Sequence, residues 1–168
     1  MTKKYLIPLA LLCLSPSVTM AQQTDGDTGL LSFGVGYYDI FDHAGAADFR
    51  LEYRSSHRYF WHIKPWAGAE ITSDGSVWGG GGLLADIPVG DDYYVAPSLG
   101  VGLYARGSSD KDLGSTIQFR SQIEGGVKLS SGARLGVALS HLSNCHLGDD
   151  NPGTEVLNLY LHIPIEKF

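Results

Sequence analysis

The fold is decided by a stretch in which apolar and polar side chains alternate strictly, Ala47-Asp48-Phe49-Arg50-Leu51-Glu52-Tyr53-Arg54. In a β-strand, successive side chains point to opposite faces of the sheet. One face of this stretch is therefore apolar, and the other carries charges of both signs. The pattern predicts a strand that lies between a hydrophobic environment and a polar one.

The same period of two recurs along the chain, and the odd-numbered residues form the apolar face almost throughout. It predicts eight strands, within the ranges 31–37, 47–54, 59–72, 77–87, 93–106, 117–129, 134–140 and 155–165.

A soluble sandwich would also alternate, with its apolar face turned inward. Three features favour a membrane barrel instead. The even-numbered face mixes charged residues with glycine, as a narrow barrel interior requires. Several strands reach the roughly ten residues that a tilted membrane strand needs. The last apolar strand is followed by a terminal phenylalanine, Phe168, which resembles the terminal signal of outer-membrane barrels. We expect an all-β fold, an eight-stranded antiparallel transmembrane β-barrel of the outer membrane.

The first residues are typical of a secretory signal. Lys3 and Lys4 precede an apolar run that is too short to cross a bilayer as a helix, and a small-residue cleavage site ends at Ala21. We expect residues 1–21 to be a signal peptide and residues 22–168 to form a single barrel domain. Removing the two lysines moves the net charge from −6 to −8, which argues against a nucleic-acid partner.

The predicted topology places both termini in the periplasm, because the number of strands is even. The short connections are then periplasmic turns, at 55–57, 88–92 and 130–132. The remaining connections are extracellular, at 39–46, 73–75, 107–114 and 144–154. Most of these are longer than the turns, as expected for outer-membrane barrels.

The last hairpin carries an unusual set of polar residues. His141 and Ser143 continue the apolar phase of their strand, and Glu155 is in phase with the apolar face of the next one. Ionisable groups that face hydrocarbon are costly, so we interpret the set as functional. If Ser143 pairs across from Glu155, the carboxylate lies diagonally to His141 and within its reach. Ser143 would then be the nucleophile, His141 the base, and Glu155 the acid that orients the imidazole.

The run His141-Leu142-Ser143-Asn144-Cys145-His146-Leu147-Gly148-Asp149-Asp150-Asn151-Pro152-Gly153-Thr154-Glu155 resembles the signature of the lipid A 3-O-deacylases, the PagL family. That family has His-x-Ser-Asn, followed at the same spacing by Asn-Pro-Gly-x-Glu. The resemblance implies an esterase that releases the 3-hydroxyacyl chain from the 3-position of lipid A, the lipid part of lipopolysaccharide. It implies a site at the outer leaflet and a reaction that needs no metal or other cofactor.

The resemblance also implies roles for residues around the triad. Asn151 would donate a side-chain hydrogen bond to the oxyanion, and Asn144 would contact the substrate. The second oxyanion donor would be the backbone N–H of His146, where the family usually has glycine. Alternatives are a non-enzymatic barrel of adhesion or structural type, and another outer-membrane lipid enzyme such as a phospholipase or acyltransferase. The oligomeric state is open, with a homodimer as one alternative.

Aromatic residues and histidines outside the motif have structural interpretations. His62 and His162 lie on the inward phase and are expected to form hydrogen bonds in the barrel interior. Trp66 and Trp78 are expected to fill the interior, whereas Trp61 matches an aromatic residue at the membrane interface.

Overall fold

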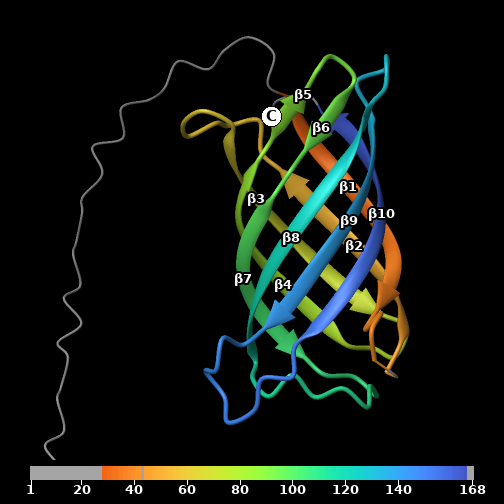
Figure 1. The fold of residues 1–168 in the computed structure, drawn as a ribbon, viewed down its shortest axis with the longest axis vertical. Helices are drawn as coiled ribbons and strands as arrows, with labels where there is room; N and C mark the ends of the chain where they lie inside the picture. The colour runs from red at the N-terminus through yellow and green to blue at the C-terminus, as the bar shows by residue number, and fades with distance from the viewer. Residues whose placement is uncertain (1–27, 43, 166–168) are drawn as a thin grey trace, which may run out of the picture.

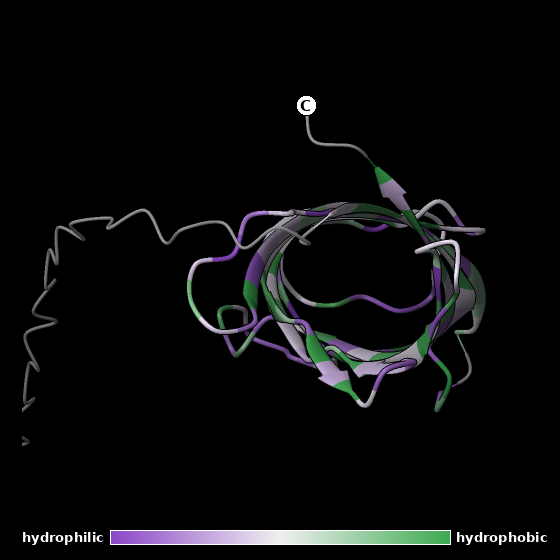
Figure 2. Ribbon diagram, turned by 90° about the horizontal axis from the view of Figure 1, so that it is seen from above, coloured by the Kyte–Doolittle hydropathy of each residue, from purple (hydrophilic) through white to green (hydrophobic). Residues whose placement is uncertain are grey.

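The computed structural model describes residues 28–42 and 44–165, and these residues form a closed antiparallel β-barrel (Figures 1 and 2). The predicted signal peptide and Phe168 lie outside the described residues. The boundary between signal and barrel therefore stays a prediction. Among the described residues there is no helix long and apolar enough to cross a membrane.

The strand bounds follow the period of two in the sequence. The strands are β1 (Gly29–Tyr38), β2 (Ala46–Arg54), β3 (Ile63–Thr72), β4 (Val77–Ala85), β5 (Ile87–Val89), β6 (Tyr93–Val95), β7 (Ser98–Ala105), β8 (Ile117–Lys128), β9 (Arg134–Ser143) and β10 (Thr154–Ile165). β4 and β5 are separated by one residue, and β6 and β7 by two. Each of these pairs therefore forms one interrupted strand of the barrel wall. The described residues thus form the eight-stranded barrel that the sequence predicted.

Two pairings close the ring. β1 pairs with β10, and β8 pairs with β9, so both strands of the last hairpin, β9 and β10, are paired on each side. The barrel has two unlike ends (Figure 1). We call the end with the connections 39–45, 73–76, 106–116 and 144–153 the loop end. The opposite end, with the connections 55–62, 90–92 and 129–133, is the turn end.

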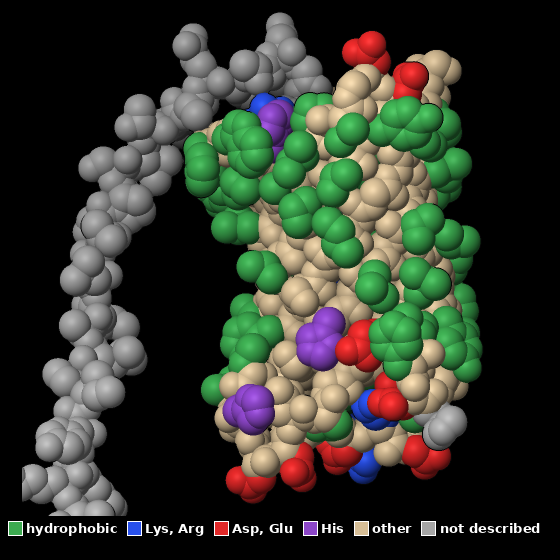
Figure 3. Space-filling view, viewed as in Figure 1, with side chains coloured by type: hydrophobic (Ala, Val, Ile, Leu, Met, Phe, Trp, Pro, Cys, Tyr) green, Lys and Arg blue, Asp and Glu red, His purple; other side chains and the backbone are tan. Residues whose placement is uncertain are grey.

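The two faces of the wall differ as the alternation predicted. Apolar side chains from the odd-numbered positions cover the outside, and Leu99, Leu103 and Leu159 are each at least 60% exposed. On the face shown in Figure 3, hydrophobic side chains are distributed along the wall, and acidic side chains lie mainly at the loop end, with others at the turn end. Most of the even-numbered charged residues of the strands are buried inside the barrel. An outside this apolar requires a lipid environment rather than water.

Ion pairs fill the barrel interior. Arg50 Nη2 lies 2.8 Å from a carboxylate oxygen of Glu70, and Arg54 Nη2 lies 2.6 Å from Glu124. Arg120 pairs with Glu52 and also stacks its guanidinium 4.2 Å above the ring of Trp66. Because these buried charges compensate one another, the narrow lumen can hold them.

The aromatic and histidine predictions are confirmed in part. Trp66 and Trp78 are buried and stack inside the barrel, and His162 is buried beside Glu124. His62 lies before the start of β3 and is not among the buried residues of the interior.

The third predicted strand starts too early, which explains the error for His62. The alternation suggested a strand from position 59, but β3 begins at Ile63. Trp61 has a φ of 48°, which is incompatible with an extended strand, so the chain turns there. His62 therefore belongs to a turn and is only half-buried. The predicted turn at 88–92 is also shorter, because Ile87–Val89 pairs with Tyr93–Val95.

Candidate active site

His141 and Glu155 form a hydrogen-bonded pair on the outer face of the barrel. His141 lies on β9, and Glu155 is its direct partner on β10. The distance between Nδ1 of the imidazole and Oε1 of the carboxylate is 2.9 Å. An ionised carboxylate can only accept, so Nδ1 donates, and Nε2 is the nitrogen left to take a proton. The imidazole is 44% exposed and the carboxylate 31%, so both can be reached from outside the barrel.

The register of this hairpin differs from the one considered from the sequence. Glu155 lies opposite His141 and not opposite Ser143. Pairing between β9 and β10 ends at Leu142 and Thr154, because the chain leaves the sheet after Ser143. A shift of two residues preserves the face to which each side chain points. Directly opposed side chains are also closer than diagonal ones, so the shift brings base and carboxylate together.

Two serines of the described chain flank His141 on this face. Ser143 follows it by two residues on β9, at roughly 6.6 Å between backbone positions. Ser121 lies on β8, directly opposite His141. Sequence analysis did not select Ser121. Its position could have been noticed in the sequence, because Ser121 places a hydroxyl between Phe119 and Ile123 on the apolar, odd-numbered face of β8.

The buried side chain of Asn144 anchors the loop 144–153. Its amide Nδ2 donates to the carbonyl oxygen of Leu113 at 2.9 Å and to that of Asp150 at 2.7 Å. The backbone N–H of Asn144 donates to Oδ1 of Asn151 at 2.9 Å. Because Oδ1 of Asn151 accepts this bond, the orientation of that amide is set and its Nδ2 points elsewhere. In the structure the Asn144 side chain holds the loop in place through these hydrogen bonds. A contact with substrate stays a prediction.

Positions 145 and 146 adopt a left-handed backbone conformation. The φ angles are 51° for Cys145 and 62° for His146, values that residues other than glycine rarely adopt. The backbone at His146 therefore has the conformation that a glycine there would favour. Both side chains are exposed, and Cys145 is a free thiol. The role of the His146 N–H stays a prediction.

A second set of contacts holds the residue before Glu155. The hydroxyl of Thr154 donates to Oδ1 of Asp39 at 2.9 Å, and both residues are buried. Nζ of Lys111 lies 2.9 Å from the same oxygen and also pairs with Asp42. Burial lowers the pKa of Lys111, but Asp42 and Asp39 outweigh burial and raise the pKa above its usual value. The charged ammonium thus links the connections 39–45 and 106–116 to the start of β10.

Gly153 packs directly against the candidate base. Its φ is 65°, in the left-handed region, and a Cβ added there would lie 2.7 Å from Cε1 of His141. Packed carbon atoms prefer separations near 3.5–4.0 Å. Gly153 is therefore needed for two reasons, the backbone conformation and the space that the imidazole occupies.

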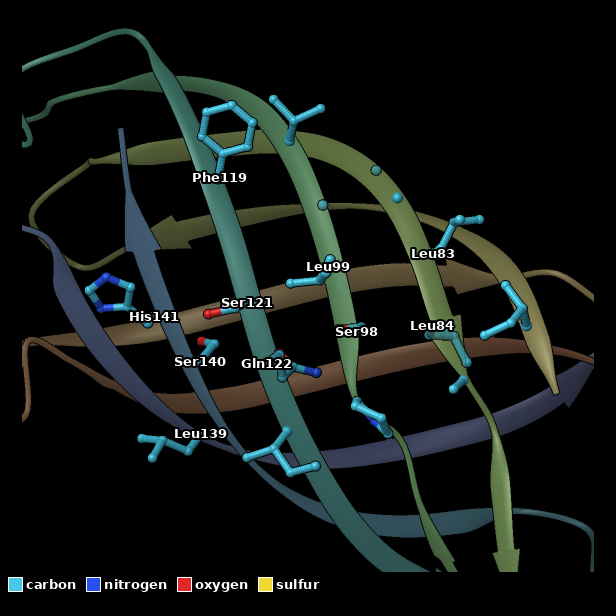
Figure 4. Close-up of a pocket in the computed structure, with 18 of the residues that line it drawn as sticks. Leu83, Leu84, Ser98, Leu99, Phe119, Ser121, Gln122, Leu139, Ser140 and His141 are labelled. Carbon is cyan, nitrogen blue, oxygen red and sulfur yellow. The ribbon is translucent and has the colours of Figure 1, made fainter. Parts of the chain in front are cut away.

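An open groove of about 990 Å³ extends from this pair over the outer face of the barrel. It begins at His141 and Glu155 and reaches Phe60 and Ile63 near the turn end. Most of the other residues that line it are aliphatic, aromatic or glycine. Figure 4 shows His141 on one side of the groove and Leu83 on the other, with the strands between them. The arrangement can hold a long apolar chain with its polar end at the imidazole.

Among the residues that the structure describes, no group of three or more His, Cys, Asp and Glu side chains is placed to hold a metal ion.

Comparison with known proteins decides the family. The model of the family "Lipid A 3-O-deacylase (PagL)" matches residues 47–164, which is most of the chain. The chain belongs to the PagL family. The match contains β3 to β9, nearly all of β2 and β10, and the whole 141–155 motif. The motif was therefore a correct indicator of the family.

Individual PagL proteins are similar over nearly their full length. The lipid A deacylase PagL of Bordetella bronchiseptica is 27% identical, with 93% of each chain covered. That of Pseudomonas aeruginosa is 28% identical, with 96% of this chain and 99% of the relative covered. The crystal structure of the outer membrane enzyme PagL superposes with a TM-score of 0.61 at 22% identity, over 81% of this chain and 99% of the other. At that identity the superposition supports the barrel fold alone.

Proposed function

We propose that this protein is a serine esterase of the outer membrane that hydrolyses the 3-O-linked 3-hydroxyacyl chain of lipid A. The observation that carries the proposal is the hydrogen bond between Nδ1 of His141 and Oε1 of Glu155 on the apolar outer face. Such a pair is costly where it would face hydrocarbon, and it matches the base and orienting acid of a catalytic triad. Membership of the PagL family supports lipid A as the substrate.

Ser143 is the proposed nucleophile. Its Oγ attacks the carbonyl carbon of the ester, and its proton passes to Nε2 of His141. The tetrahedral intermediate collapses, and the oxygen of the sugar leaves with the proton from His141. Water then attacks the acyl-enzyme with His141 again as base, and the free 3-hydroxy fatty acid is released. Glu155 holds the imidazole tautomer and stabilises its charged form through both steps.

Asn151 and His146 are the proposed oxyanion donors. The amide Nδ2 of Asn151 is free to donate because Oδ1 accepts from the backbone of Asn144. The left-handed backbone at His146 supports a donor at the position where the family has glycine. Loss of one such donor typically lowers turnover by about 10²–10³.

The groove and the two unlike barrel ends suggest how the protein is oriented in the outer membrane. We propose that the loop end faces the cell exterior, so that His141 and Glu155 lie at the level of the outer leaflet. The short turns and both termini are then periplasmic, as in other small barrels. The acyl chain would lie in the apolar groove and descend along the wall into the membrane while its ester stays at His141.

Mass spectrometry of lipid A tests the proposal. Lipid A is extracted from cells that make the wild-type protein, Ser143→Ala, His141→Ala, or the control Ser131→Ala at the turn end. We expect the wild type and the control to remove one 3-hydroxyacyl chain. Ser143→Ala and His141→Ala should lower the rate by on the order of 10⁴-fold or more.

Other outcomes distinguish the alternatives. Intact lipid A in cells with a correctly folded wild-type barrel would contradict the proposal and favour an adhesion or structural role. Intact lipid A together with altered phospholipids would instead favour a phospholipase or an acyltransferase.

A further inference from the structure

We propose that Phe60 closes the far end of the groove and thereby sets the longest acyl chain that is removed efficiently. This inference rests on the proposed function, because it assigns a chain-length limit to the same site. It concerns a residue of the connection 55–62, at the opposite end of the wall from the loop 144–153.

The strand register places the groove along one continuous row of the barrel wall. His141 pairs with Ser121 on β8, and Ser121 pairs with Leu99 on β7. Leu99 pairs with Leu83 on β4, and Leu83 pairs with Pro65 on β3. All five side chains have the outward phase. A chain that starts at His141 therefore crosses four strand spacings before it reaches β3, a path of roughly 19 Å.

Phe60 stands where this path ends. It lines the groove together with Ile63, the first residue of β3. The backbone N–H of Ile63 donates to the carbonyl oxygen of Phe60 at 3.0 Å, and that of Tyr59 donates to the carbonyl oxygen of Ile63 at 2.9 Å. These bonds hold the turn closed, so the ring of Phe60 has a fixed base beside the end of the groove.

The length of the path translates into a chain length. An extended saturated chain advances about 1.25 Å per carbon, from a bond of about 1.5 Å at a near-tetrahedral angle. A path of roughly 19 Å therefore accommodates about 15 carbons. A longer chain must bend around the ring of Phe60 or leave the groove, and the ester is then less well placed at His141.

The adjacent residue Trp61 provides a matched control. It belongs to the same turn as Phe60, and the two are similarly exposed, at 62% and 69%. Trp61 does not line the groove. Loss of an aromatic side chain that merely anchors the turn to lipid would affect both residues, whereas a limit on chain length depends on Phe60 alone.

The experiment uses the full-length protein in detergent micelles and a series of lipid A analogues whose 3-O-acyl chain increases in steps of a few carbons. For the wild type we expect the rate to drop about tenfold beyond the groove length, as a misfitted methylene does in other apolar sites. Phe60→Ala should move this drop to longer chains, and Phe60→Trp should move it to shorter ones. Trp61→Ala should leave it in place.

The two proposals fail in different ways. If the wild type hydrolyses the series but Phe60→Ala and Phe60→Trp both leave the drop at the wild-type length, the role of Phe60 is wrong and the esterase stands. If the folded wild type releases none of the acyl chains, the proposed function fails, and the chain-length limit fails with it.

Discussion

At the residue scale, Gly153 carries the sharpest prediction about the candidate base. An alanine there would bring Cβ to 2.7 Å from Cε1 of His141, so the imidazole must move away. Displacement of a catalytic group by about 1 Å can cost about 10² in rate. We therefore expect Gly153→Ala to lower lipid A deacylation by about 10²-fold, measured as released fatty acid, while the barrel stays folded.

The control for this prediction is Gly90→Ala at the turn end. Gly90 has a φ of 63°, close to the 65° of Gly153, but an added Cβ would meet no atom within 4 Å. The two variants share the backbone cost and differ in the contact with His141. Equal activity of the two variants would show that the position of the imidazole is not critical.

At the scale of elements, the loop 144–153 depends on one buried amide. Asn144→Ala leaves the carbonyl groups of Leu113 and Asp150 without their donor, at a cost of about 1–3 kcal/mol. We expect faster hydrogen exchange in the loop and lower activity, with unchanged exchange in β9 and β10. The exposed residue Asp149 of the same loop is the matched control, and Asp149→Ala should change neither quantity. Unaltered exchange in Asn144→Ala would refute the anchoring role.

At the scale of the whole molecule, the interior charges set the stability of the barrel. Glu124 lies 2.6 Å from Nη2 of Arg54 and 2.9 Å from Nε2 of His162, and it accepts a hydrogen bond from Tyr94 at 2.7 Å. Removing one partner of a buried ion pair costs about 3–5 kcal/mol. Glu124→Ala should lower the free energy of unfolding by that amount in urea titrations in lipid vesicles. Asp110→Ala, on an exposed connection, should leave it nearly unchanged.

The sequence predicted the fold because a period of two is a local property. Each strand shows which side chains share a face, so the barrel and the outward direction of His141 and Glu155 could be predicted without long-range contacts. The start of β3 could not be predicted in this way. The alternation continues through Trp61, but the positive φ there depends on how the turn closes on Ile63.

Details of the candidate site depend on contacts between distant segments. Glu155 pairs with His141 and not with Ser143. Both registers place every side chain on the same face of the sheet, so the alternation of the sequence could not distinguish them. The anchoring of Asn144 requires a carbonyl group 31 residues earlier in the chain. Ser121 enters the site only because β8 pairs with β9 and closes the barrel.

The central claim is that Ser143 is a nucleophile activated by the pair His141–Glu155. It is tested most directly by reacting the folded protein with an alkyl fluorophosphonate, which phosphonylates activated serines, and by mapping the adduct with peptide mass spectrometry. We predict one adduct, on Ser143, whose formation is largely lost in His141→Ala. An adduct on Ser121 instead, or labelling of Ser143 that does not depend on His141, would contradict the account.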